Sequence, residues 1–473
     1  MPKLRDVTPT RWSPRGEAIA DIPGERQPLL VWQGIVGEAG DVELGYVGKH
    51  QAFGHWVHSR GPDPHRAHPP CPRYTKCGGC AWMHLDDDGQ EAGRRWLVRQ
   101  ALDEQGLADV ELGQWTPSPD GLAGFRHVVK VGFDISPKGT LRMGAWGRRT
   151  REVVPIPKCD VAAPVLQKVM ASLAHHAIGM RFRPYDPHTD QGTLRAAVLR
   201  ASRSTGQVIV TLVAGRRTRA LQELAEILGQ QCPEIAGIWL HLNADEGNAI
   251  FGRDEEGEIR TMPLAGRDTI EETLGEVTYQ VGPGDFFQTN PGTAEALYAR
   301  VMELLAPGPE DALVDLYCGV GGMALQAAAR GAFVTGVEEI AGAVERARAA
   351  AHQNKLSARF TVGRVADVVP QLAENLAASA PLVTVNPARR GLEEGVVDHI
   401  LALRPRRIAY VSCNAKALAR DLVLFRERGF RIGAIDLFDM FPNTPHVETL
   451  TVLEPADAPT STRRPPRRKV VRR

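Results

Sequence analysis

The sequence of 473 residues predicts an α/β protein with a small N-terminal β-barrel, a central α/β domain and a C-terminal doubly wound parallel sheet. From Asp311 onward, apolar runs of strand length alternate with stretches of helix length, the pattern of a parallel sheet covered on both faces. Before about residue 60, short apolar runs are separated by glycine turns, as in a small barrel. We therefore expect domains at 1–65, 66–285 and 286–458, followed by a disordered basic tail at 459–473.

The first two domains are defined by strands and by one proline-rich hinge. Four short strands are expected in the N-terminal domain, at Glu17–Ile22, Pro28–Trp32, Asp41–Val47 and His55–Val57. Prolines between residues 60 and 71 mark the hinge. Beyond it we expect a helix and four strands, at Glu91–Gln105, Val128–Ile135, Ala196–Ala201, Gln207–Val213 and Gly237–Asn243.

The C-terminal domain shows the clearest alternation of strands and helices. Strands are expected at Ala312–Leu316, Phe333–Val337, Leu382–Val385, Arg407–Val411, Arg431–Asp436 and His446–Glu454. Helices are expected at Gly322–Arg330, Ala341–Asn354, Glu393–Ala402 and Ala415–Arg428. This order predicts a parallel sheet with an antiparallel edge.

Composition excludes some classes of protein. No run of about eighteen apolar residues predicts a membrane span, and no apolar signal core follows Met1, so we expect a cytoplasmic protein. Seven Lys or Arg residues lie within Arg463–Arg473, which leaves the rest of the chain net acidic although the whole carries +1. A polyanionic partner would therefore be bound by this tail and by local basic patches, for which His55–Arg73, Arg142–Arg151 and Arg216–Arg219 are candidates.

A glycine-rich loop, Asp315–Gly322, follows one expected strand and opens a helix. Its glycines allow close approach of a cofactor to the backbone, and the helix N-terminus offers free N–H groups. Glu338 ends the next strand, where a carboxylate can accept hydrogen bonds from a ribose diol. Since the loop is not Gly-x-Gly-x-x-Gly, S-adenosylmethionine fits better than a dinucleotide; the alternative is a glycine turn that binds nothing.

Cys413 follows an apolar strand and precedes a helix. A thiol there is a candidate nucleophile, and we expect the helix N-terminus to lower its pKa; the alternative is strand packing. Glu448, in the last expected strand, is a candidate general base that would need a partly desolvated site to raise its pKa. The alternative for Glu448 is an ordinary exposed strand acid.

A second group of cysteines has the spacing of metal ligands. Cys71, Cys77 and Cys80 lie close together beside two glycines, and Cys159 is a plausible distant fourth ligand. Four thiolates suit either zinc or an iron–sulfur cluster, and spacing alone does not choose between them.

Taken together, these segments resemble the RNA uracil-C5 methyltransferases that modify 23S ribosomal RNA and tRNA, over about residues 10–454. The motifs that carry the resemblance occur in the family's order: 70–82, Asp285–Asn290, Asp315–Gly322, Asn386–Gly391, Ser412–Asn414, and Asp439–Pro442 through Glu448. The resemblance implies a Rossmann-like S-adenosylmethionine-dependent domain, a TRAM-like RNA-binding barrel at the N-terminus and an iron–sulfur domain between them. It further implies a [4Fe-4S] cluster held by Cys71, Cys77, Cys80 and Cys159.

The same resemblance assigns roles to individual residues. Residues that match contacts to S-adenosylmethionine are Gln288, Tyr317, Glu338 and Asn386. Cys413 matches the nucleophile that adds to uracil C6, and Glu448 matches the base that removes the C5 proton. The uridine would be flipped out of the RNA; Phe286, Phe287, Arg389 and Arg390 would line its pocket, with core packing the alternative for the two phenylalanines.

The substrate inside the family is less firmly marked. Many members have Asp-Pro-Pro-Arg where this chain has Asn386-Pro-Ala-Arg389, and the segments 386–391 and 437–442 look more like the 23S ribosomal RNA branch. We therefore expect a monomer that methylates 23S rRNA. Alternatives are tRNA T-loop methylation, cytosine-C5 methylation, a non-catalytic RNA-binding protein of the same fold, and a zinc-stabilised nucleic-acid-binding protein.

Overall fold

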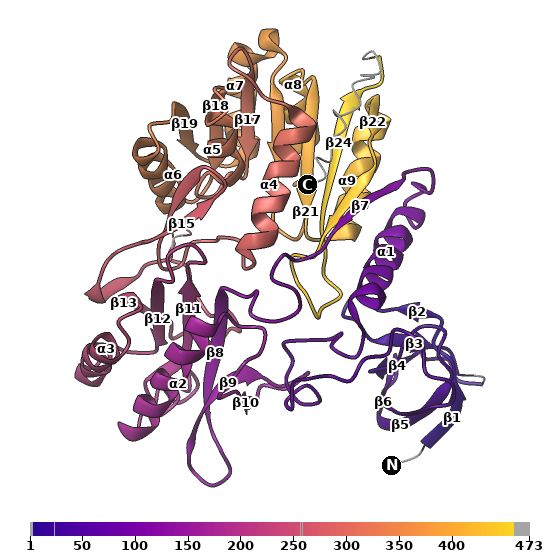
Figure 1. Cartoon of the computed structure of the whole chain (residues 1–473), viewed down its shortest axis with the longest axis vertical. Helices are drawn as coiled ribbons and strands as arrows, with labels where there is room; N and C mark the ends of the chain where they lie inside the picture. Colours follow the sequence, from indigo (N-terminus) through magenta and orange to yellow (C-terminus); the bar gives the residue numbers. More distant parts are fainter. Residues whose placement is uncertain (1–2, 23, 256, 258, 458–473) are drawn as a thin grey trace, which may run out of the picture.

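The computed structural model describes residues 3–457 apart from 23, 256 and 258, so the expected disorder of the tail at 459–473 lies outside the described residues. Three units surround a common centre (Figure 1). The sheet of the first unit has the order β1-β5-β6-β4-β3-β2. Its strands are β1 (Lys3–Val7), β2 (Arg11–Trp12), β3 (Ala18–Ala20), β4 (Leu29–Trp32), β5 (Gly40–Val47) and β6 (Ala52–Ser59). The expected small all-β unit is confirmed; within the described residues β1 and β2 do not pair, so a closed TRAM-like barrel stays a prediction.

The central unit is one seven-stranded sheet backed by two helices, α2 (Pro164–Gly179) and α3 (Arg219–Gln231). The sheet order is β10-β9-β8-β11-β12-β13-β14. Its strands are β8 (Val128–Ile135), β9 (Leu141–Trp146), β10 (Val153–Pro155), β11 (Leu194–Ala201), β12 (Val208–Ala214), β13 (Ile235–Leu242) and β14 (Met262–Gly266). A hairpin of β15 (Ile270–Leu274) and β16 (Val277–Val281) then leads to the last unit.

The C-terminal unit is a nine-stranded sheet with the order β19-β18-β17-β20-β21-β24-β23-β7, in which β22 also pairs with β24. The strands are β17 (Ala312–Leu316), β18 (Phe333–Glu338), β19 (Ala358–Val362), β20 (Leu382–Val385), β21 (Arg407–Ser412), β22 (Phe430–Ile432), β23 (Ile435–Phe438), β24 (Glu448–Pro455) and β7 (Leu112–Thr116). Strands β19 to β21 run parallel, and β24 is antiparallel to β21, so the expected antiparallel edge is confirmed.

Helices cover both faces of this sheet because its strands are apolar on both sides. Neighbouring residues show it: Leu313 packs into the core with α4 (Pro291–Leu305), α5 (Gly322–Ala328) and α6 (Ala341–Gln353), whereas Val314 packs into the opposite core. That second core contains α7 (Val365–Leu376), α8 (Val396–Ala402), α9 (Ala415–Glu427) and α1 (Asp87–Asp103). A doubly wound sheet is therefore confirmed.

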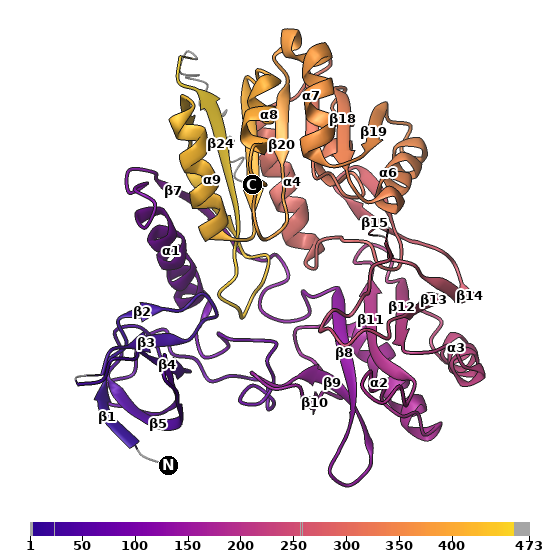
Figure 2. The ribbon, with the colours of Figure 1, turned by 180° about the vertical axis from the view of Figure 1, so that it is seen from behind.

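Segment 87–116 reaches across from the first half of the chain. Helix α1 packs against α9 (Figure 2), and β7 adds a parallel strand beyond β23. The expected strand at Arg431–Asp436 was wrong as a single element, because the chain bends at Gly433 and forms β22 and β23 instead. None of the helices in the described part of the chain is long and apolar enough to cross a membrane.

Candidate active site

A cleft of about 1320 Å³ opens at the carboxyl ends of β17, β18, β20 and β21. It is lined by residues of all three units, including Arg15 of the first and Lys130 of the second. Parallel strands place their carboxyl ends at one edge of a sheet, which is where ligands bind in open α/β folds. The glycine-rich loop, segment 386–391 and Cys413 all line this one cleft.

The glycine-rich loop between β17 and α5 is built from left-handed residues. Tyr317, Gly319 and Gly321 have φ of 61°, 55° and 88°. A Cβ at Gly319 would meet nothing within 4 Å, so glycine serves the backbone conformation there rather than relieving a clash. The loop thus leaves open space beside its backbone, as cofactor binding requires.

Two carboxylates hold this loop in place. Asp315 is fully buried, accepts hydrogen bonds from the Thr384 hydroxyl (2.6 Å) and the Ala324 N–H (2.8 Å), and burial raises its pKa to about 7. Glu338 is half-buried and accepts from the Gly319 and Ile340 N–H groups, each at 3.0 Å. Sequence reasoning included Asp315 in the motif but gave it no role, because its partner Thr384 lies on another strand.

All four residues expected to contact the cofactor line the cleft: Gln288, Tyr317, Glu338 and Asn386. Gln288 is buried and hydrogen-bonds to Tyr298 of α4. These residues come from four separate segments of the chain, and the structure brings all of them into the lining of one cleft.

Cys413 and Glu448 are brought together by strand register. β21 and β24 are antiparallel with Ser412 opposite Thr449, so the next pair outward joins Cys413 and Glu448. The Thr449 hydroxyl donates to the Ser412 carbonyl at 2.8 Å, which fixes this register at the cleft edge. A thiol and a carboxylate 35 positions apart in sequence thus face the same cleft.

Burial dominates the electrostatics of this pair. Glu448 is only 3% exposed, and burial raises its pKa to about 8, so the expected desolvated site is confirmed and an exposed strand acid is excluded. The expectation of a lowered thiol pKa was wrong. Burial, reinforced by the Glu448 carboxylate, raises the pKa of Cys413 to about 11 despite the adjacent N-terminus of α9.

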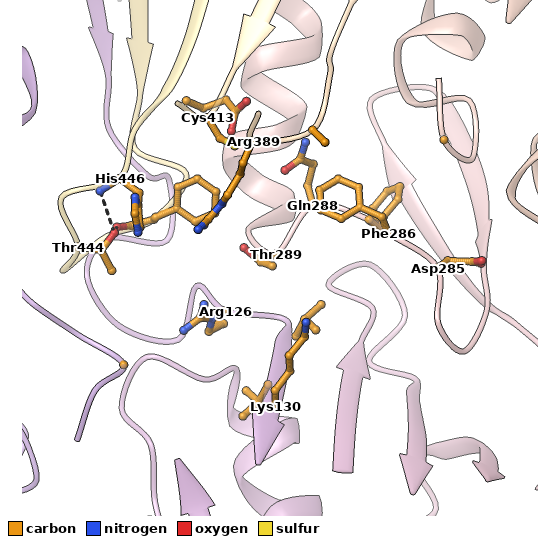
Figure 3. A pocket seen from close by; sticks show the side chains of 18 of the residues that line it. Arg126, Lys130, Asp285, Phe286, Gln288, Thr289, Arg389, Cys413, Thr444 and His446 are labelled. Atoms are coloured by element: carbon orange, nitrogen blue, oxygen red, sulfur yellow. Dashed lines mark hydrogen bonds between the residues drawn. The ribbon is translucent and has the colours of Figure 1, made fainter. Parts of the chain in front are cut away.

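Arg389 is the cation that serves this pair. Its side chain lies beside Cys413, and its charge lowers the pKa of both Cys413 and Glu448. Its neighbour Arg390 pairs instead with Glu393 at 2.7 Å. Figure 3 shows Arg389 and Cys413 on one wall of the pocket and Arg126 and Lys130 on the facing wall.

The loop before Glu448 is anchored by residues from the first half of the chain. Arg94 of α1 is fully buried, donates to two carbonyl oxygens of the loop at 3.1 Å, and pairs with Asp439 at 3.2 Å. Asn443, with φ of 64°, accepts through its carbonyl oxygen the N–H groups of the two residues that follow Cys80, both at 2.9 Å. Sequence reasoning missed these anchors because no local pattern links α1 to this loop.

The four cysteines expected to bind a metal all line the same cleft and are free thiols. Cys71 and Cys77 interact electrostatically, as do Cys80 and Cys159, and burial raises the pKa of Cys77, Cys80 and Cys159. Yet no group of three or more His, Cys, Asp or Glu side chains in the described ranges is arranged to hold a metal ion. The structure gathers the four thiols in one neighbourhood and does not confirm the metal site.

The two phenylalanines of the Asp285–Asn290 segment have different environments. Phe287 is 6% exposed and belongs to the core, as the packing alternative expected, whereas Phe286 is 74% exposed and lines the cleft. An exposed aromatic ring at the cleft can stack on a base.

Comparison with known proteins gives a consistent result. Residues 249–455 match the family model described as tRNA (uracil-5-)-methyltransferase. The chain is 31% identical over 452 residues to an uncharacterized RNA methyltransferase of Listeria innocua, covering 93% of this chain and 94% of that protein. A similar protein of Geobacter sulfurreducens is 32% identical over 418 residues, covering 87% and 82%. The crystal structure of the Pyrococcus abyssi tRNA (uracil-54, C5)-methyltransferase with S-adenosyl-L-homocysteine superposes with a TM-score of 0.73 at 26% identity, over 95% of this chain and 99% of that one.

Proposed function

Because this chain belongs to the RNA (uracil-5-)-methyltransferase family and is an enzyme of that kind, we propose that it methylates C5 of a specific uridine in 23S rRNA with Cys413 as nucleophile and Glu448 as base. The observation that carries this proposal is the pairing of Cys413 with Glu448 beside the glycine-rich loop. A thiol alone would suit many enzymes, whereas a thiol with a desolvated carboxylate suits a reaction that adds to a ring and then removes a proton from it.

The chemistry requires both groups because C5 of uracil is a poor nucleophile. The Cys413 thiolate adds to C6 and forms a C–S bond, which places electron density on C5. S-adenosylmethionine, when bound, supplies the methyl group that C5 takes. Glu448 then accepts the C5 proton, the C5–C6 double bond re-forms, and Cys413 leaves as thiolate. The thiol proton goes to solvent before the first step and is not needed again.

The pKa values favour these roles in two ways. A carboxylate with a pKa near 8 is a stronger base than an ordinary glutamate and holds the C5 proton more firmly. The thiol needs help, because its pKa near 11 leaves little thiolate at neutral pH. Arg389 gives that help through its positive charge, and we assign it the role of stabilising the thiolate.

We propose that Gln288, Tyr317, Glu338 and Asn386 bind S-adenosylmethionine, with Glu338 accepting hydrogen bonds from its ribose. Support comes from their place in the lining of one cleft and from the glycine loop with its left-handed residues, which lines the same cleft. The target uridine would enter from the opposite side, next to the exposed Phe286 ring.

The choice of 23S rRNA rests on segments 386–391 and 437–442, which look like the ribosomal RNA branch. A second candidate is tRNA, because the matching family model and the P. abyssi enzyme are both described as tRNA methyltransferases. We also propose that the N-terminal unit binds RNA, as a TRAM-like domain does.

We further propose that Cys71, Cys77, Cys80 and Cys159 hold a [4Fe-4S] cluster. The chemistry of the donors suits a cluster, since four free thiols with this spacing line the cleft and influence one another's pKa. Methyl transfer needs no electron, so a bound cluster would supply only a rigid attachment for the chain around Cys80. A brown protein purified without air, against a colourless one, separates iron–sulfur from zinc.

Methyl transfer from labelled S-adenosylmethionine to unmodified 23S rRNA and to unmodified tRNA tests the function, with Cys413→Ala as control. The nucleosides are then identified by mass. Label in 5-methyluridine from 23S rRNA, lost in the variant, is the expected result. Label in tRNA alone would favour the second candidate. Label in 5-methylcytidine would show that the target nucleobase is cytosine and not uracil, and no label in either RNA would refute the proposal.

A further inference from the structure

Two cations on the cleft wall opposite Cys413 have no protein partner. Lys130 and Arg126 both line the cleft, and within residues 3–457, positions 23, 256 and 258 aside, neither side chain makes an ion pair or a hydrogen bond. Lys130 is also the one charged residue in the otherwise buried stretch from Val128 to Phe133, and it is the one exposed position there. Figure 3 shows both side chains projecting into the space below Arg389.

Three other cations of the same cleft are neutralised by acids. Arg149 pairs with Glu17, Arg346 with Asp285, and Arg364 with Glu393. The charged neighbours that act on Lys130, in contrast, are all cations: Arg200, Arg126 and Arg389. Desolvation and then these three like charges lower the pKa of Lys130, and the like charges cost free energy unless an anion joins them.

Arg126 lies at the meeting point of several parts of the cleft. Its charge acts on the thiols of Cys77, Cys80 and Cys159, on His446 of the loop before Glu448, and on Lys130. An anion bound by Arg126 and Lys130 would therefore lie between the cysteine segment and the catalytic pair. Mobile salt ions would not fix a position there, whereas a polyanion that threads the cleft would.

We propose that Arg126 and Lys130 bind two phosphate groups of single-stranded RNA, those that flank the flipped-out nucleotide, and so hold its base against Cys413. This inference rests on the proposed function. Four residues of extended chain separate the two Cα atoms by about 13 Å, so the two cations contact different phosphates of one strand. Positions four apart also share a face, which directs both side chains into the cleft.

The assignment divides the cleft into two walls with separate tasks. Arg389 and Cys413 act at the target nucleobase, while Arg126 and Lys130 contact the RNA phosphate backbone and do not distinguish one RNA sequence from another. The two phosphate contacts offset part of the unstacking cost of flipping a base.

Binding of fluorescein-labelled oligouridylate and oligoadenylate to Lys130→Gln and Arg126→Gln, measured from about 50 to 300 mM salt, tests this inference. Lys138→Gln and Arg359→Gln are matched controls: both residues are exposed, unpaired in the described chain, and outside the cleft lining. Each test variant should bind both strands several-fold more weakly, and its plot of log affinity against log salt should be shallower by about 0.7. The controls should match wild type, and melting curves should show all four variants folded.

Kinetics with the RNA that wild type methylates give a second readout. Loss of a phosphate contact should raise KM for RNA while kcat at saturating RNA changes by no more than about twofold. Variants that keep the wild-type salt slope on both oligonucleotides would overturn the inference, and so would a loss confined to oligouridylate, which would place the cations on the base. Oligoadenylate carries no uridine, so its binding tests the phosphate contacts separately from methylation. A protein that binds oligoadenylate through these cations but transfers no methyl group to 23S rRNA or tRNA would refute the proposed function and leave the phosphate contacts standing.

Discussion

Replacing Arg389 should reduce methyl transfer through the ionisation of the catalytic pair. In Arg389→Met, both Cys413 and Glu448 lose a positive charge that stabilises their anionic forms. An opposite charge close to an ionisable group shifts its pKa by about 1–3 units, and because Arg389 is solvent-exposed we take the lower value. That equals a rise of about one unit in the pKa of the thiol.

The consequence for rate follows from the thiolate fraction. Well below a thiol pKa near 11, this fraction falls about tenfold for each unit that the pKa rises. We therefore expect kcat/KM to fall at least about tenfold at every pH from 7 to 9. The inflection that reports Glu448, near pH 8 in wild type, should also move upward, since the carboxylate form loses its nearby cation.

The assay is the pH profile of kcat/KM for label transfer from S-adenosylmethionine. Arg428→Met is the control, because Arg428 pairs with Asp398, lies outside the cleft lining and does not act on the pair. Arg389→Lys keeps the charge without the planar fork and should fall between the two. A profile of Arg389→Met that coincides with wild type in height and inflection would refute this role.

Three further predictions concern cofactor affinity, the cost of burying the base, and the anchoring of its loop. Glu338→Ala should weaken S-adenosylmethionine binding, measured by calorimetry, at least about tenfold. The variant removes the acceptor of the Gly319 and Ile340 N–H groups and of the ribose hydroxyls. The neighbouring Glu339→Ala variant should bind as wild type does, and equal affinities of the two variants would contradict the assignment. Glu448→Gln should stabilise the fold at high pH. The pKa of Glu448 is near 8 in the folded state and 4.5 ordinarily, so the free energy of unfolding of wild type falls as pH rises from 4.5 to 8. Glutamine does not titrate, so the variant lacks this fall. The melting temperature of the variant minus that of wild type should grow from pH 5 to pH 8, and the corresponding difference in unfolding free energy should reach a few kcal/mol. A difference that stays constant with pH would contradict the prediction. Arg94→Met should cost about 3–5 kcal/mol in urea unfolding by leaving Asp439 buried and unpaired, whereas Arg95→Met should cost far less; equal losses would argue against the anchor.

The sequence predicted best those elements whose environment is uniform along their length. Ala312–Leu316 and Leu382–Val385 are strands as expected, because central strands of a parallel sheet are apolar on both faces and read as unbroken hydrophobic runs. The start of α1 was placed four residues late, since its N-terminus depends on the Asp86 side chain capping the Gly89 N–H. Segment 431–436 was predicted as one strand because no local sequence pattern predicts the break between β22 and β23 at Gly433.

The candidate site shows a similar limit. Cys413, Glu338 and the glycine loop were found from their positions at strand ends, which is a local property. The neighbours that set their chemistry were not, because burial of Glu448 and the approach of Arg389 to Cys413 depend on strand register and loop packing. For the same reason the thiol pKa was expected to fall and instead rises: the helix terminus is visible in the sequence, whereas the burial is not.

The central claim is that Cys413 attaches to the uridine and Glu448 releases it. The most direct measurement is a denaturing gel of Glu448→Gln mixed with unmodified 23S rRNA and S-adenosylmethionine, with Cys413→Ala and the double variant as controls. Without the base the C5 proton stays in place, so Glu448→Gln should accumulate an RNA–protein adduct that survives denaturation and is absent when Cys413 is replaced. Full turnover by Glu448→Gln without an adduct, or an adduct that persists in the double variant, would contradict the account.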